Sequence, residues 1–206
     1  MTKTFFYTIN LTLLSLGCTG CFLFGPQGPS KPAFDPAGSA DQAISTYDTN
    51  SDGVIDEQEV KTSPGLTAAF KNIDKDGDGR LTAEEIAARI NYYKSAPTTI
   101  VQGSTRVKYK GRLLPDATVT FEPESFLGEA FLTCTGVTDE NGIASIKGHD
   151  STYPGIYLGF YRVRITKDNK GKEMLPAKYN VDTELGYEAT DDMNVGLAEI
   201  INFNLK

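Results

Sequence analysis

The chain has no tryptophan, a single histidine and three cysteines among its 206 residues. With His149 as its only imidazole, it cannot build a catalytic or metal site that needs two histidines. Cys18, Cys21 and Cys134 are too few for a disulfide scaffold or a four-cysteine zinc site. A long basic run is also missing, and the formal charge is −7. We therefore expect no nucleic-acid partner.

Charge is also scarce at the N-terminus, where Lys3 is the one charged residue before Lys31. The apolar and hydroxylic segment from Phe5 to Gly17 is typical of a secretory signal. It ends in Leu-Ser-Leu-Gly-Cys18, which resembles the lipobox of bacterial lipoproteins. The resemblance implies that residues 1–17 are removed and that Cys18 carries a diacylglycerol.

An uncleaved membrane helix is the alternative, because Phe5 to Phe24 is uncharged and long enough to cross a bilayer. Both interpretations place the remainder outside the cytoplasmic membrane. Thr19 follows Cys18, and the sorting rule of diderm lipoproteins then favours the outer membrane. Residues 18–38 are rich in proline and glycine, and we expect them to form an extended, lipidated tether.

Two acidic twelve-residue segments follow, at 48–59 and 74–85. Both match the EF-hand pattern D-x-[DN]-x-[DN]-G-x5-E. Calcium is a hard cation that takes six to eight oxygen ligands, and this spacing folds the chain around the ion. Glycine at the sixth position allows the sharp turn, and the seventh position contributes its backbone carbonyl. The predicted ligands are Asp48, Asn50, Asp52, Val54, Asp56 and Glu59 in the first loop, and Asp74, Asp76, Asp78, Arg80, Thr82 and Glu85 in the second.

The flanking residues have helical spacing, which predicts an EF-hand pair over residues 39–96 with two bound calcium ions. The first helix is expected to begin near Ser39, and Ser63-Pro64 fits the start of the middle helix. Ile55 and Leu81, at the eighth loop position, are expected to pair as a small two-stranded ladder. The short separation of the loops also resembles dockerins. Dockerin loops usually end in Asp, so Glu59 and Glu85 favour the EF-hand pair.

From residue 97 to 206 the period becomes alternating, which predicts strands. Buried and exposed residues alternate in each strand, as in a β-sandwich of two sheets. The expected strands lie at 99–109, 116–122, 131–137, 143–147, 159–167, 185–190 and 198–205. Turns are expected at Lys110-Gly111, at 139–142 and at Pro154-Gly155.

Four strings in this half carry a family resemblance: GRLLPDATVTFEP from Gly111, VTDENG from Val137, YRVRITK from Tyr161 and LPAKYN from Leu175. Together they resemble the carboxypeptidase-regulatory-like, transthyretin-type sandwiches of secreted bacterial proteins. The resemblance implies a seven-stranded prealbumin-like β-sandwich over about 99–206. The fold class expected for the whole chain is therefore multidomain, α plus all-β. The resemblance implies little about function, because the fold is a common accessory scaffold.

We find no catalytic set in the β-sandwich and expect that the protein is not an enzyme. Hydrolases on the transthyretin scaffold need several histidines, whereas His149 lies alone in an expected loop. Cys134 is expected to be a buried apolar residue, and a disulfide to Cys21 is disfavoured because Cys21 lies on the tether. An aromatic cluster at Tyr153, Tyr157, Phe160 and Tyr161 is expected to pack on the sandwich, with a sugar- or protein-binding patch as the alternative.

These patterns together predict an exported, membrane-tethered calcium-binding protein that acts as a binding or structural module of the cell envelope. Its expected partners are the membrane, through the lipid, and an envelope protein or glycan, through the β-sandwich. A calcium sensor that exposes an apolar groove is the second hypothesis, and an uncharacterised hydrolase is the third. A sensor should gain exposed apolar surface with calcium, whereas a structural module should gain only stability.

Overall fold

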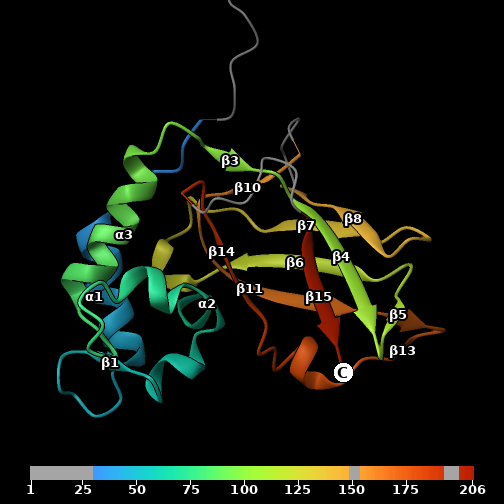
Figure 1. Cartoon of the computed structure of the whole chain (residues 1–206), viewed down its shortest axis with the longest axis horizontal. Coiled ribbons are helices and arrows are strands. Elements are labelled where there is room, and N and C mark those ends of the chain that lie inside the picture. Colours follow the sequence, from blue (N-terminus) through green and yellow to red (C-terminus); the bar gives the residue numbers. More distant parts are fainter. Residues whose placement is uncertain (1–29, 149–153, 193–199) are drawn as a thin grey trace, which may run out of the picture.

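The computed structural model describes residues 30–148, 154–192 and 200–206. A helical region, residues 30–96, lies beside a β-region formed by the remaining described residues (Figure 1). The described helices include none that combines the length and apolar character needed to cross a membrane. The order of the elements, three helices and then β-sheets, agrees with the predicted order of the two parts.

Three helices form the helical region: α1 (Pro36–Tyr47), α2 (Pro64–Ile73) and α3 (Ala83–Ser95). The Ser63 hydroxyl caps α2 by accepting the Leu66 N–H, and a proline occupies the first turn, as predicted. Thr82 and Glu85 form a reciprocal capping box at the start of α3. A short 3-10 helix, η1 (Glu59–Thr62), precedes α2.

The two loops between these helices are joined by a two-residue ladder. Strand β1 (Ile55–Asp56) pairs antiparallel with β2 (Arg80–Leu81), and Ile55 lies opposite Leu81. Both of these apolar side chains are fully buried. The predicted Ile55–Leu81 pairing is therefore confirmed.

The end of the expected tether folds differently from the prediction. Helix α1 begins at Pro36, because Asp35 accepts the Gly38 N–H and proline is favourable in a first helical turn. The Phe34 ring packs edge-on against Phe131 at a centroid distance of 5.0 Å. Lys31 donates to the backbone oxygens of Lys94 and Ala96. Residues 31–38 therefore belong to the folded part, and the expectation of an unpacked tether up to residue 38 was wrong for this segment.

One sheet of the β-region has the order β14-β11-β6-β7-β9, with all neighbours antiparallel. Its longest strands pair over six residues, with Val163 opposite Phe121. Fully buried and half-buried residues alternate along these strands, with the period that the sequence predicted. The strands are β14 (Gly186–Ala189), β11 (Gly159–Thr166), β6 (Thr118–Pro123), β7 (Cys134–Val137) and β9 (Lys147–Gly148).

The second sheet has the order β15-β4-β5, and β8 also pairs with β4. Strand β15 runs parallel to β4, whereas the other two pairings are antiparallel. The turn between β4 and β5 contains Lys110 and Gly111, both at positive φ, as expected for a tight hairpin. The strands are β15 (Ile201–Leu205), β4 (Ser104–Tyr109), β5 (Arg112–Leu113) and β8 (Ile143–Ser145).

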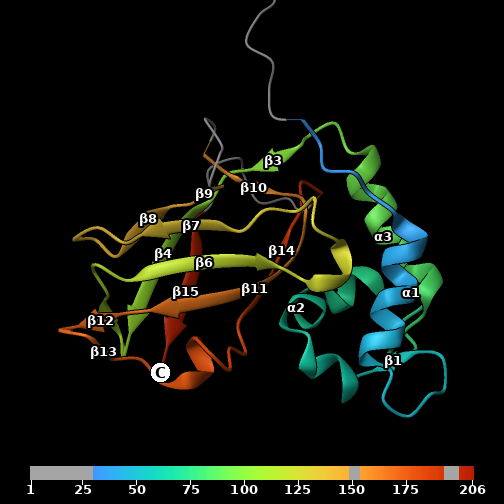
Figure 2. The ribbon, with the colours of Figure 1, turned by 180° about the vertical axis from the view of Figure 1, so that it is seen from behind.

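The two sheets stack face to face, with β4 and β15 in front in Figure 1 and β6 and β11 in front in Figure 2. A buried cluster fills the space between them and includes Val107, Phe121 and Phe203. The Phe121 and Phe203 rings lie 6.2 Å apart across the layers. This core belongs to the β-region alone, since every buried member of the cluster comes from residues 107–205.

The expected strands all have counterparts, with several shorter than predicted. The first is interrupted after Val101 into β3 (Ile100–Val101), which pairs with β10, and β4, which pairs with β8. Glycine suits position 103 between them, because a Cβ there would lie 2.8 Å from that of Ile146. The third begins at Cys134, and Leu132 is 40% exposed. Five further short segments complete the described part of the region: β10 (Ile156–Tyr157), β12 (Asp168–Asn169), β13 (Lys172–Glu173) and the 3-10 helices η2 (Ser125–Leu127) and η3 (Ala177–Tyr179).

The core of the helical region is completed by side chains from the β-region. One buried cluster joins Leu66, Ile86 and Tyr93 of the helices to residues of the β-region. The contributing residues of the β-region are Phe126, Leu127, Phe131, Leu158 and Phe160. Helix α2 lies so close to β14 that a Cβ at Gly186 would come within 1.7 Å of the Pro64 carbonyl oxygen. The two regions therefore pack as one body.

Candidate metal centre

The first acidic residue of each loop folds the backbone around its carboxylate. Asp48 Oδ1 accepts the Ser51 N–H at 2.6 Å, and Oδ2 accepts the Gly53 N–H at 2.9 Å. Asp74 makes the equivalent bonds to Gly77 at 2.7 Å and Gly79 at 3.1 Å. The glycines at the sixth position have φ of 89° and 81°, which a residue with a Cβ rarely adopts. Both loops therefore have the turn that the motif predicted.

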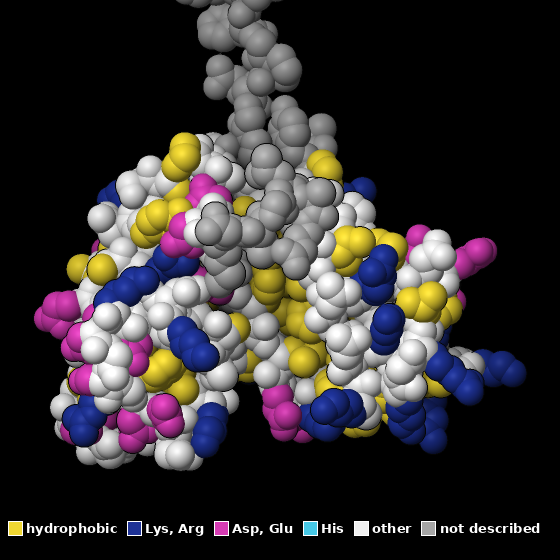
Figure 3. Space-filling view, viewed as in Figure 1, with side chains coloured by type: hydrophobic (Ala, Val, Ile, Leu, Met, Phe, Trp, Pro, Cys, Tyr) yellow, Lys and Arg dark blue, Asp and Glu magenta, His cyan; other side chains and the backbone are white. Residues whose placement is uncertain are grey.

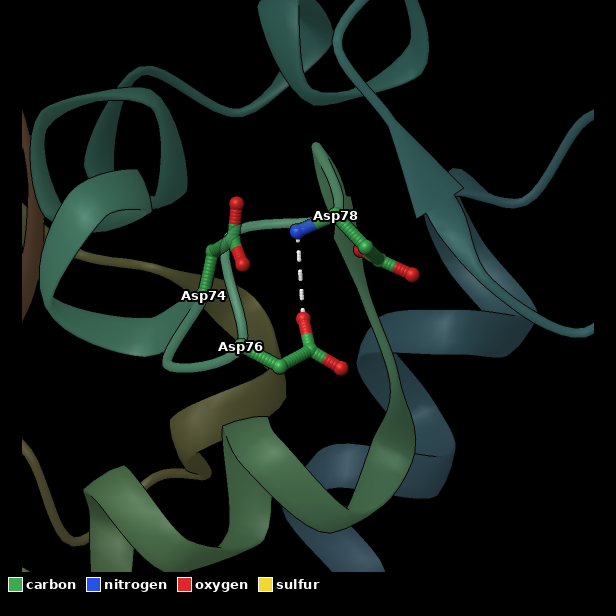
Figure 4. A group of neighbouring side chains, drawn as sticks. All are labelled: Asp74, Asp76 and Asp78. Atoms are coloured by element: carbon green, nitrogen blue, oxygen red, sulfur yellow. Dashed lines mark hydrogen bonds between the residues drawn. The ribbon is translucent and has the colours of Figure 1, made fainter.

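The third and fifth positions continue the same pattern. In the second loop, Asp76 Oδ1 accepts the Asp78 N–H at 3.1 Å (Figure 4). Asp78 Oδ1 in turn accepts the Arg80 N–H at 2.8 Å. Carboxylate oxygens of Asp74, Asp76 and Asp78 lie within 4.8 Å of one another. Three like charges so close together repel unless a cation neutralises them.

The third and fifth positions of the first loop are related in the same way. Asn50 Oδ1 accepts the Asp52 N–H at 2.8 Å, and Asp52 Oδ1 accepts the Val54 N–H at 3.2 Å. The amide oxygen of Asn50 thus takes the place that a carboxylate has in the second loop. Both loops present oxygen atoms at these positions, so the sequence difference preserves the class of ligand.

The glutamate at the twelfth position folds back over each loop. Glu59 Oε1 accepts the Thr49 N–H at 2.8 Å, and Oε2 accepts the Asp56 N–H at 3.1 Å. Glu85 makes the matching bonds to Lys75 and Thr82, both at 3.1 Å. Hydrogen bonds from Asp56 and Thr49 lower the pKa of Glu59 to about 2. This carboxylate is therefore anionic at neutral pH and faces the loop that it closes.

The ninth and seventh positions fit the same scheme. Asp56 Oδ1 accepts the N–H groups of Gln58 and Glu59, and the Thr82 hydroxyl accepts the Glu85 N–H. At the seventh position, Val54 directly precedes β1, and Arg80 is the first residue of β2. The side-chain atoms predicted to bind the ion are all oxygens, and such a set of ligands suits a hard cation such as calcium.

A buried glutamate of the β-region, Glu124, contacts both helices that flank the first loop. Its side chain is 2% exposed. Glu124 Oε2 accepts the hydroxyl of Tyr47, which directly precedes the loop, at 3.0 Å. Glu124 Oε1 accepts the Gly65 N–H of α2 at 2.8 Å. Burial and the charge of Glu124 raise the pKa of Tyr47 to about 12, so the phenol remains a donor.

A second buried glutamate, Glu188 on β14, contacts both helices that flank the second loop. Its side chain is 1% exposed. Glu188 Oε2 accepts the Asn72 amide of α2 at 2.6 Å, and Oε1 accepts the Tyr93 hydroxyl of α3 at 2.5 Å. Burial and the charge of Glu188 raise the pKa of Tyr93 well above its usual value. Each loop is thus bordered by two helices that share one carboxylate of the β-region.

The Glu188 contact also contains a buried cation. Arg89 Nε of α3 lies 2.6 Å from Glu188 Oε1, and its two terminal nitrogens bond Asp192 at 2.5 and 3.0 Å. The guanidinium is 5% exposed and lies over the Tyr92 and Tyr93 rings. The hydrogen bonds from Arg89 lower the pKa of Asp192 to about 2. This arrangement satisfies a charge that would otherwise be costly to bury.

Of the other residues singled out in the sequence, some lie outside the described part of the chain and others are buried. Cys18, Cys21, His149 and Tyr153 lie outside the described residues. Cys134 is fully buried, and burial raises the pKa of its thiol to about 11, in keeping with a packing role.

Three members of the predicted aromatic cluster, Tyr157, Phe160 and Tyr161, lie within the described residues. Phe160 and Tyr161 are buried, and the Tyr161 hydroxyl donates to the Tyr157 backbone oxygen at 2.9 Å. Phe160 contacts Tyr93 of the helical region, at a centroid distance of 5.3 Å. The packing alternative is therefore confirmed for Phe160 and Tyr161.

Sequence reasoning missed Glu124, Glu188 and Arg89. One signal was present, because Arg89 falls among Ile86, Ile90 and Tyr93 on the apolar face of α3. An arginine there requires a buried acidic partner. The sequence does not say which of its carboxylates that partner is, since Glu188 lies 99 residues away.

A family model described as EF hand matches residues 40–62 and 66–88. No curated protein and no solved structure matches the chain. The chain therefore contains an EF-hand pair followed by a β-rich region, and the EF-hand pair indicates calcium binding.

Proposed function

We propose that the protein is an exported, lipid-anchored module of the cell envelope, in which two calcium ions stabilise the folded structure. One observation carries the calcium part: the two loops repeat the same hydrogen bonds at positions 1, 3, 5 and 12, with oxygen ligands facing inward. The matching geometry supports one ion in each loop, held by the twelve predicted ligands.

A structural role for calcium is supported better than a sensor role. Sensor EF-hands change the angle between their helices and expose an apolar groove. Here Glu124 bonds both α1 and α2, and Glu188 bonds both α2 and α3, so a change of angle would break buried hydrogen bonds. The apolar side of the helices is also covered by Phe126 and Phe160 of the same chain.

The envelope location follows from Cys18, whose surroundings resemble a lipobox. The β-region is proposed to be a transthyretin-type sandwich, supported by the four sequence strings and by two stacked sheets with a shared core. We assign it no catalytic role and propose an envelope component as its partner. Labelling with a fatty acid tests the anchor: Cys18→Ser should abolish the label and Cys21→Ser should retain it. Label that survives Cys18→Ser contradicts the proposal.

Thermal unfolding with calcium and with a chelator tests the structural role. Binding to the folded form alone adds on the order of 2.7 kcal/mol per site when free calcium is a hundredfold above its dissociation constant. We expect one cooperative transition for the whole chain, shifted upward by calcium, because the helical core includes residues of the β-region. Binding of an apolar dye should not rise. A calcium-induced rise in dye binding would instead support the sensor.

Calorimetry assigns the ions to the loops. Glu59→Gln and Glu85→Gln should each weaken one of two sites, since each removes charge from a bidentate ligand. Glu140→Gln, in an exposed turn of the β-region, is the matched control and should leave both sites unchanged. A wild-type stoichiometry below two, or equal effects of all three variants, would refute the assignment.

A further inference from the structure

A cationic face lies on the sheet β15-β4-β5, on the side of the molecule away from the calcium loops (Figure 1). It consists of Arg106 and Lys108 on β4, with Lys110 in the following turn, whereas Arg112 on β5 lies opposite Tyr109 and therefore on the other side of the sheet. Figure 3 shows dark-blue side chains gathered over this part of the molecule. The sequence places these cations at alternate positions of one short segment, and the strand puts Arg106 and Lys108 on the same side of the sheet.

The residues beside the cationic face are neutral. In the strand register, Asn202 lies opposite Arg106, and Asn204 lies opposite Lys108. The side chains at these positions point outward, since their neighbours Val107 and Phe203 face the core. The four strands β4, β5, β8 and β15 contain no acidic residue, and none occurs from Ile86 to Pro115. This is unusual in a chain with 27 acidic residues.

On the opposite sheet, by comparison, the positive charges of arginines are paired with glutamates. Arg164 Nε lies 3.0 Å from Glu122, and Arg162 lies 3.8 Å from Glu124. Among the described residues, by contrast, no carboxylate lies within ion-pair distance of the cationic face. The nearest acidic turn contains Asp139 and Glu140, and the Asp139 carboxylate already accepts N–H groups of its own turn.

From this surface we infer that the cationic face binds an extended acidic polysaccharide, one that carries carboxylates along its chain. The positive charges match the carboxylates. Asn202, Asn204 and the hydroxyl of Ser104 supply neutral donors and acceptors for sugar hydroxyls. The site is the flat outer face of a sheet, which suits an extended polymer that spans several residues.

The position of the face favours a polymer over the membrane surface. The first described residues lie at one end of the molecule and the β4–β5 turn lies at the other (Figure 1). If the chain is anchored through Cys18, as proposed above, the β4–β5 turn lies at the end of the molecule far from the residues that follow the anchor. This inference names the partner of the proposed envelope module, but its test does not depend on the anchor or on calcium stoichiometry.

Binding of a hyaluronan decasaccharide to the calcium-loaded protein, measured by calorimetry, tests the inference. We expect binding that weakens as salt rises from about 50 to about 300 mM, because Arg106 and Lys108 are only half-buried and remain in contact with solvent. Arg106→Glu with Lys108→Glu should lower the affinity about tenfold or more, since two attractions become repulsions. Lys71→Glu with Lys147→Glu changes the net charge equally on α2 and β9 and should have less than about a twofold effect.

Several outcomes would overturn the inference. These are equal losses in the two double variants, equal binding of neutral dextran, or binding only to vesicles with anionic lipid or to an oligonucleotide. Arg106→Gln with Lys108→Gln guards against misfolding, and it should weaken hyaluronan binding while keeping the wild-type melting temperature. The Glu59→Gln and Glu85→Gln variants separate this result from the calcium proposal, because each should weaken one calcium site but keep the dependence of hyaluronan binding on Arg106 and Lys108.

Discussion

The two EF-hands are attached to the β-region by different chemistry. At the first loop, Glu124 bonds the helical region through two neutral donors, the Tyr47 hydroxyl and the Gly65 N–H, while the cation near it, Arg162 at 3.8 Å, belongs to the β-region. At the second loop, Glu188 shares the buried guanidinium of Arg89 with Asp192. A neutral donor that loses its acceptor leaves one hydrogen bond unmade, whereas a buried cation that loses its partner leaves an uncompensated charge. The second attachment is therefore the more sensitive to substitution.

The largest effect is expected from Phe160→Ala, which tests whether the two attachments act together. Phe160 is fully buried between Tyr93 of α3 and Phe126 of η2. Truncation of a buried phenylalanine costs about 3–5 kcal/mol of unfolding free energy. We expect denaturant unfolding to show this loss together with weaker calcium binding in both loops. Phe203→Ala, in the core of the β-region alone, should lower stability without changing calcium affinity of the folded protein.

Glu188→Gln tests the charged attachment. It removes one of the two carboxylates that face Arg89, and hydrogen bonds to charged groups contribute about 1.5–3 kcal/mol. We expect a loss of that size in denaturant unfolding and a larger loss of affinity in the second loop than in the first. An unchanged second loop would show that the attachment does not affect calcium binding.

Glu124→Gln tests the neutral attachment and should have a smaller effect. Glutamine keeps one acceptor oxygen for either Tyr47 or Gly65, so about 0.5–1.5 kcal/mol of stability should be lost. The affected site should be the first loop. If Glu124→Gln proves as costly as Glu188→Gln, the distinction between the two attachments fails.

The smallest effect concerns acid pH. The hydrogen bonds from Arg89 lower the pKa of Asp192 to about 2, below its usual value near 4. A carboxylate with a lowered pKa contributes stability above its unfolded value, and the contribution is lost as the pH falls toward about 2. The stability difference between wild type and Asp192→Asn should therefore shrink between pH 5 and pH 2.5. A difference that stays constant would contradict this role.

The sequence predicted the loops, the Ile55–Leu81 pairing and the Ser63-Pro64 helix start, because each depends on residues close together in the chain. The alternation in strands such as 159–167 was equally local. The attachments could not be predicted in this way, since Arg89 and Glu188 are brought together only by packing α3 on β14. The parallel pairing of β15 with β4 is non-local for the same reason. Pro36 was ambiguous, because proline suits both an extended tether and a first helical turn.

The contact of Gly186 with Pro64 determines how this protein can be recombined with others. A β-region transplanted from another protein can accept these helices only with glycine at the position of Gly186, since any side chain there meets the α2 backbone. It also needs acidic residues at the positions of Glu124 and Glu188. Three matched positions, two on β14 and one at Glu124, rule out simple exchange by fusion at a linker. In the design of chimaeras, the EF-hand pair and the β-region should therefore be transferred together.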